Sequence, residues 1–174
     1  MDLKQALYAE HSKQQTDQII FWIGSNPGRF AKLMEVFFSD DQVLAQRSAW
    51  AVGLIGRKYP NMFYPFLEQS INQLQHTNNH DAVIRNILRV IQDIQVPEHL
   101  EGILVELCIA YVVNPKAPGA IKAFSISTLE NISSKYPELV REILHILKER
   151  IDNETPAFIS RAKRFIIRYS KNTK

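Results

Sequence analysis

The 174-residue sequence has one cysteine, six glycines and no long hydrophobic run. The single Cys108 cannot form a disulfide within the chain, and so few glycines favour helices over a turn-rich sandwich or barrel. The longest nearly apolar run, residues 103–113, contains Glu106 and is far shorter than the roughly 20 residues that cross a bilayer. Residues 1–6 do not begin a basic segment followed by an apolar one, so we expect no secretory signal. These features predict a cytoplasmic protein without a membrane segment.

Acidic residues are absent from the last part of the chain. Residues 155–174 contain six basic side chains and no acidic one, a net charge of +6. Because the whole chain carries only +3, residues 1–154 carry −3. The basic character therefore belongs to the last expected helix and not to the body of the protein.

Signals for helix starts recur along the chain. Aspartates at Asp2, Asp40–Asp41 and Asp81 can accept hydrogen bonds from free N–H groups, and prolines such as Pro60 and Pro137 suit a first helical turn. The apolar residues between these signals recur at helical spacing. The expected helices cover residues 2–11, 12–24, 29–38, 42–58, 60–75, 81–95, 97–113, 120–135, 137–151 and 155–169.

The start signals repeat with a period of about 40 residues. Pro60, Pro97 and Pro137 are 37 and 40 residues apart, and Lys58-Tyr59-Pro60 recurs 77 residues later as Lys135-Tyr136-Pro137. A helical hairpin repeated at this period is typical of an α-solenoid. We predict one all-α domain over residues 1–174, a short right-handed solenoid of about four antiparallel helix pairs; a four-helix bundle is the alternative. The expected repeats are residues 12–38, 40–75, 80–113 and 117–151, with a capping helix over 155–170.

Two segments carry a family resemblance. Asp81-Ala82-Val83-Ile84-Arg85 and Asp41-x-Val43 with Arg47 and Ala49 resemble the aspartate, valine-arginine and alanine pattern of HEAT repeats, and residues 121–123 and 160–162 resemble weaker copies. The resemblance covers roughly residues 15–170 and includes the armadillo-like repeats in a broad sense. It implies a stack of helix pairs, with the second helix of each pair on the concave side, that binds partners.

The residues that catalysis or metal binding needs do not occur in a suitable arrangement. His76 and His80 are four residues apart but are separated by an expected loop, and Cys108 lies among apolar residues as an inert thiol. The loop over residues 24–29 lacks the strand and the Gly-Lys-Ser/Thr ending of a phosphate loop, so it reads as a helix–helix turn. We therefore predict no enzyme, no metal and no cofactor.

Two features in the body of the chain are candidates for partner binding. The aromatic cluster that includes Tyr59, Phe63 and Tyr64 is dense enough to place a ring on a concave surface, although most aromatics at helical spacing are core. The helix over residues 102–113 is apolar on all sides except at Glu106, which predicts full burial. Its alternative is an outer face that packs on another chain, as in a homodimer.

The last helix separates an apolar stripe from a basic row. Arg161, Arg164, Arg168 and Lys171 fall on one side of it, which we expect to be exposed. This row is either the polar cap that a solenoid end requires or a contact for an acidic partner or for phosphates. Ile167 would be exposed if nothing covers it, which favours a partner.

Some HEAT-like proteins are DNA glycosylases with a basic concave groove, so nucleic-acid binding is the alternative function. The expected concave helices, residues 61–75, 98–113 and 138–151, together carry −4, which is the wrong sign for gripping phosphates. Nucleic acid would have to bind the basic terminal helix instead. The sequence thus predicts a non-catalytic scaffold that binds an unidentified protein partner.

Overall fold

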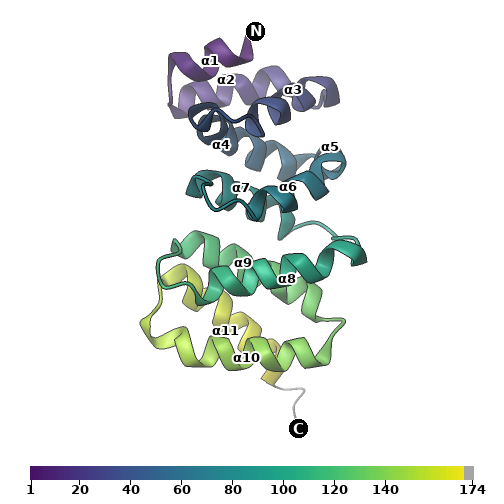
Figure 1. Ribbon diagram of the computed structural model, residues 1–174, viewed down its shortest axis with the longest axis vertical. Coiled ribbons are helices and arrows are strands. Elements are labelled where there is room, and N and C mark those ends of the chain that lie inside the picture. Colours follow the sequence, from purple (N-terminus) through teal and green to yellow (C-terminus); the bar gives the residue numbers. More distant parts are fainter. Residues whose placement is uncertain (171–174) are drawn as a thin grey trace. The chain divides into compact units, whose positions relative to one another are not determined.

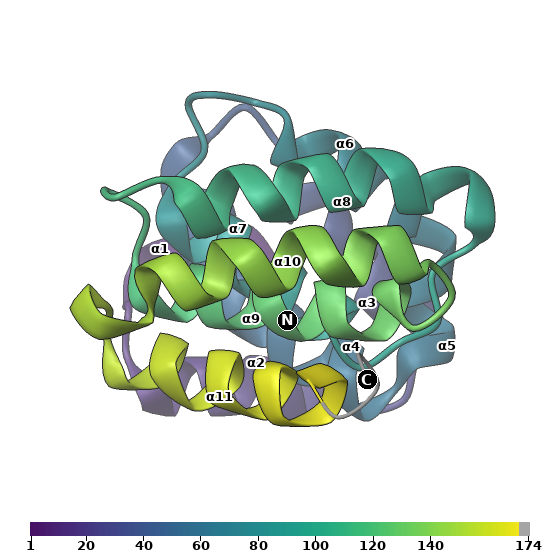
Figure 2. The same cartoon turned by 90° about the horizontal axis from the view of Figure 1, so that it is seen from below.

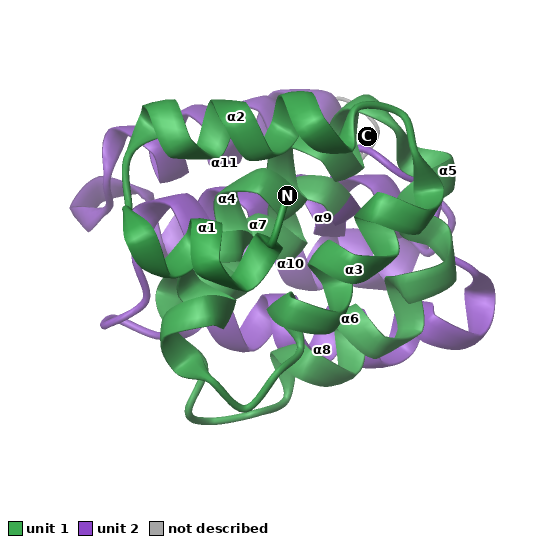
Figure 3. Ribbon diagram, turned by 90° about the horizontal axis from the view of Figure 1, so that it is seen from above, with its two compact units in different colours: residues 1–90 green, residues 91–174 purple. Residues whose placement is uncertain are grey.

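The computed structural model describes residues 1–170 and is helical throughout, with no strand among these residues. The chain forms two compact units, residues 1–90 and residues 91–174 (Figure 3). The boundary falls inside the segment expected to be the third repeat. Each unit is described below by itself, and the prediction of one repeat domain over the whole chain stays a prediction.

The first unit holds the helices of the N-terminal half (Figure 1). Local caps fix where several of them begin: Asp41 Oδ1 accepts the N–H groups of Val43 and Leu44, both at 3.0 Å, and Asn26 Oδ1 accepts that of Arg29 at 2.9 Å. The helices are α1 (Leu3–Ala9), α2 (Lys13–Ile23), α3 (Pro27–Phe37), α4 (Gln42–Lys58), α5 (Pro60–Phe63), α6 (Leu67–Leu74) and α7 (Asp81–Ile91).

Three helix limits differ from the prediction. The helix expected over residues 60–75 is interrupted by a 3₁₀ turn at Tyr64–Phe66, because Pro65 has no N–H to continue the ladder. Asp81 lies in the first turn of α7, and His80 Nδ1 accepts the N–H of Ala82 instead. The same helix ends at Ile91 and not near residue 95.

Two glycines let α7 pack closely on α4. A Cβ atom at Gly53 would lie 2.3 Å from Asn86 Oδ1, and one at Gly56 would lie 2.9 Å from Val90 Cγ2. Both neighbours are buried. These two positions therefore set the distance between the helices.

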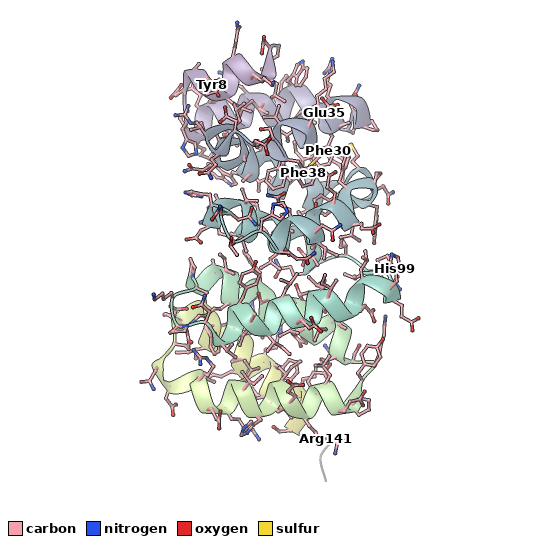
Figure 4. The ribbon with its side chains drawn as sticks, viewed as in Figure 1. Tyr8, Phe30, Glu35, Phe38, His99 and Arg141 are labelled. Atoms are coloured by element: carbon pink, nitrogen blue, oxygen red, sulfur yellow. The ribbon has the colours of Figure 1, made fainter. Side chains whose placement is uncertain are left out.

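The N-terminal helix is fastened by tertiary contacts. Arg47 Nη1 donates to the carbonyl oxygens of Leu7 and Tyr8 at 2.9 and 3.0 Å, which satisfies the free end of α1. The hydroxyl of Tyr8, labelled in Figure 4, donates to Asp41. This hydrogen bond is the main cause that raises the pKa of Tyr8 and lowers that of Asp41.

The second unit consists of two helix pairs (Figure 2). Its helices are α8 (Glu98–Val113), α9 (Gly119–Ser133), α10 (Pro137–Arg150) and α11 (Pro156–Ser170), with a 3₁₀ turn at Ile151–Asn153. Helix α9 packs against both α8 and α11, and α10 packs against α11. Helix α9 is therefore the centre of this unit, and its polar residues decide what the unit can bind.

A buried ion pair holds the start of α9 to the segment before α11. Lys122 Nζ donates to both carboxylate oxygens of Glu154, at 2.7 and 2.9 Å, and the two side chains are 4% and 8% exposed. Arg150 Nη2 lies 3.3 Å from the same carboxylate. Lys122 occupies the repeat position of Arg47, and both cations join helices that are far apart in sequence.

Candidate functional site

Three of the predicted basic residues lie together along a hollow in the second unit. The hollow has a volume of about 720 Å³ and is lined by residues 91–96, by α9, by Glu101 and Lys135, and by Arg161, Arg164 and Arg168 of α11. We call it the arginine hollow. Lys171, the fourth residue of the predicted row, lies outside the described residues.

Glu130 holds two of these arginines over α9. Its side chain is only 4% exposed, and Arg164 Nε donates to Oε2 at 2.9 Å while Arg164 Nη2 contacts the same oxygen. Arg168 Nη1 donates to Oε1 at 3.3 Å. The expectation of a row on the exposed side of the helix is therefore wrong for Arg164 and Arg168, which are half-exposed and bound to a buried carboxylate.

Arg161 differs from its two neighbours. Among residues 1–170 it makes no hydrogen bond and no ion pair, although it lies one turn from Arg164 and lines the same hollow. It is half-buried, so its guanidinium is held near the wall of the hollow and does not extend freely into solvent.

A second buried carboxylate lies at the hollow. Glu101 is bound by Lys135 Nζ and by the hydroxyl of Tyr136, the latter at 2.8 Å. Burial by itself would raise the pKa of Glu101, but the hydrogen bonds from Lys135 and Tyr136 outweigh burial and lower it. Lys135 and Tyr136 belong to the repeated Lys-Tyr-Pro motif, which therefore has a structural role here.

The charges of the hollow nearly balance. Its lining includes four cations, Lys135 and the three arginines, and three acids, Asp93, Glu101 and Glu130. One positive charge is in surplus. Because Glu101 and Glu130 are both paired, Arg161 is the cation that can account for this surplus.

The comparison with known families agrees with this architecture of helix pairs. A model of the HEAT repeat domain family matches residues 3–169. The chain belongs to the HEAT repeat family. The match confirms the predicted resemblance and the all-α fold class, and it runs through both units. No curated protein and no solved structure matches the chain.

HEAT repeat proteins generally bind other proteins or serve as scaffolds, and they are generally not catalytic. The hollow of this HEAT protein does not lie where the sequence placed a groove. Of the described residues that line it, only Glu101 comes from α8 and none comes from α10. The charge of −4 summed over the expected concave helices therefore does not describe this hollow.

The predicted aromatic cluster does not form one surface. Phe63 is completely buried in the core of the first unit, which makes its ring inaccessible to a partner. Tyr64 is 38% exposed, and Tyr59 is half-buried with Lys58 Nζ 5.3 Å from the centre of its ring. Only the two tyrosines offer any surface, and we do not include Phe63 in a binding site.

Helix α8 is not buried on all sides. Leu104, Cys108 and Val112 are buried, whereas Val113 is 40% exposed and Glu106 is exposed. The prediction of full burial was wrong because the opposite side of α8 carries half-buried side chains. The prediction for Cys108 is confirmed, since burial raises the pKa of its thiol to about 12.

Two further findings concern sites elsewhere in the described part of the chain. No three histidine, cysteine, aspartate or glutamate side chains of residues 1–170 group in a way that could hold a metal ion. Within the same residues no helix is long and apolar enough to cross a membrane.

Sequence reasoning missed Glu130 and the segment of residues 91–96. One signal for Glu130 was present: it is the only acidic residue in the otherwise apolar and small-residue sequence of α9. A lone carboxylate in a central helix needs a cation from another element. The segment after α7 left no comparable signal, because its role depends on where the preceding helix ends.

Proposed function

We propose that this HEAT repeat protein is a non-catalytic module that binds another protein at the arginine hollow of its second unit. One observation carries the proposal: a hollow of about 720 Å³ whose rim cations are fixed by buried carboxylates. Cations held in this way need little ordering when a partner binds, so the cost of association is reduced. The general role of the family in protein binding supports the same reading.

The chemistry of the hollow supports binding and not catalysis. Its hydroxyl groups are tied to their own helix, since Ser127 Oγ donates to the Ala123 carbonyl at 3.2 Å and Thr128 Oγ1 to the Phe124 carbonyl at 3.0 Å. Its described lining holds no histidine and no cysteine. Glu101 and Glu130 are paired with cations, so neither is a free general base of the kind that activates a nucleophile.

The partner in this proposal is an unidentified protein, with a second copy of the chain as the homodimeric case, in the cytoplasm and away from membranes. Nucleic-acid binding through Arg161, Arg164, Arg168 and Lys171 is less well supported. A nucleic-acid backbone requires several uncompensated cations, whereas Glu130 already binds two of these arginines.

Site-specific photo-crosslinking in the native cell tests the proposal. A photoreactive residue replaces Gln95, which is exposed and lines the hollow; the matched control replaces Lys148, which is exposed on α10 and is not part of the lining. We expect discrete protein adducts from position 95 that disappear when Arg161 is also changed to glutamate. An adduct with the mass of a dimer would identify the homodimeric case.

The outcome that contradicts the proposal is equally clear. Adducts that are the same from positions 95 and 148, or that persist in the Arg161→Glu background, would show that the hollow is not the binding surface. Adducts with nucleic acid in place of protein would support the alternative function.

A further inference from the structure

The four rim cations of the arginine hollow are not equivalent. Lys135 is paired with Glu101, and Arg164 and Arg168 are paired with Glu130, whereas Arg161 has no partner among residues 1–170. A half-buried arginine without a counter-ion has lost part of its hydration and gained nothing in exchange. An anion supplied by a ligand would remove this imbalance.

The paired arginines keep unused donors. Arg164 uses Nε and Nη2 for Glu130, which leaves Nη1 without a partner, and Arg168 uses only Nη1. A guanidinium has five N–H donors in a fixed plane that matches a carboxylate. Glu130 thus orients two guanidiniums on the same helix as Arg161 and leaves donors available for a second anion.

The charge balance limits the kind of anion. With four cations against Asp93, Glu101 and Glu130, the hollow has a surplus of one positive charge. A single carboxylate cancels this surplus, whereas a phosphate dianion exceeds it. A nucleic-acid strand would bring further charges and would be repelled by Asp93, which is exposed on the rim.

We propose that the arginine hollow recognises an aspartate or glutamate side chain in an acidic segment of a protein partner, with Arg161 as its primary contact. This inference rests on the proposed function and names the chemistry of the partner. Glu130 is a positioning residue: it holds Arg164 and Arg168 in place and keeps the surplus charge low enough to exclude polyanions.

The test begins with an array of random 12-residue peptides probed with the intact protein. We expect bound peptides to be enriched in aspartate and glutamate, and the best of them to lose about tenfold or more in affinity when its acids become amides, as measured by fluorescence anisotropy. Arg161→Gln should cause a similar loss. Arg141→Gln is the matched control, since Arg141 is an exposed arginine on α10 outside the hollow (Figure 4), and it should leave affinity unchanged.

Glu130→Gln tests the positioning role. Removing this carboxylate raises the surplus at the hollow from one positive charge to two and frees two arginines, so the acidic peptide should bind more weakly while a 20-nucleotide single strand should bind more tightly. A purely structural role would lower both affinities together. Circular dichroism on each variant separates loss of folding from loss of binding.

Several results would overturn the inference. They are an array without acidic enrichment, unchanged affinity in Arg161→Gln, and a phosphoserine peptide or the oligonucleotide binding wild-type protein more tightly than the acidic peptide. The photo-crosslinking result is independent of them. Crosslinks from position 95 combined with no acidic enrichment would leave the protein-binding function standing and remove only the carboxylate assignment.

Discussion

The ion pair between Lys122 and Glu154 gives the sharpest stability prediction. Both side chains are more than nine-tenths buried, and the amine contacts both carboxylate oxygens. Lys122→Met removes the charge and keeps most of the volume, which leaves Glu154 buried with only Arg150 at 3.3 Å. Breaking a buried pair in this way costs about 3–5 kcal/mol, and the remaining arginine should hold the loss near the lower limit.

Glu154→Leu should cost more than Lys122→Met. It leaves two cations, Lys122 and Arg150, next to one another without a carboxylate. The double variant removes the pair and replaces it with apolar groups of similar size, so it should regain about 1–2 kcal/mol relative to the sum of the single losses. Urea unfolding followed by circular dichroism measures all four proteins of this cycle.

The matched control is Lys13→Met. Lys13 forms an i,i+4 pair with Asp17 at 2.5 Å, but its side chain is 74% exposed. An exposed pair of this kind contributes about 0.3–0.5 kcal/mol. If Lys122→Met were as mild as Lys13→Met, or if the double-mutant cycle showed no coupling, the reasoning from burial would be wrong.

Three further predictions concern packing, pH and thiol reactivity. Gly56→Ala should lower the free energy of unfolding by about 1–2 kcal/mol, since the new Cβ meets Val90 at 2.9 Å, whereas Gly102→Ala, with no atom within 4 Å of its Cβ, should raise it by about 0.5–1 kcal/mol in the same urea titration. The lowered pKa of Glu101 gives stability that is complete above the ordinary glutamate range and is lost as pH falls, so between about pH 5 and pH 3 wild-type protein should lose more stability than Glu101→Gln; parallel losses would contradict this sign. Cys108 should react with a thiol reagent only at the rate of unfolding, and rapid labelling of folded protein would show that its burial is wrong.

The sequence determined the helices and the family because these depend on nearby residues. Asp41 caps α4 and prolines open α5 and α10 through contacts within one turn, so their effect can be read without a structure. The period of about 40 residues follows from the same signals, and the family match over residues 3–169 confirms the resemblance that they carried.

Only the tertiary structure decided what the arginines of the terminal helix do. A helical projection shows which residues share a face, but it does not show what that face meets. Arg164 and Arg168 meet Glu130, which is 34 and 38 residues away in the chain, and Arg161 does not. Phe63 likewise has the composition of a binding residue and the burial of a core residue. Long-range packing fixes burial and charge pairing, and these two quantities distinguish the arginine that can bind a partner from those that hold the fold.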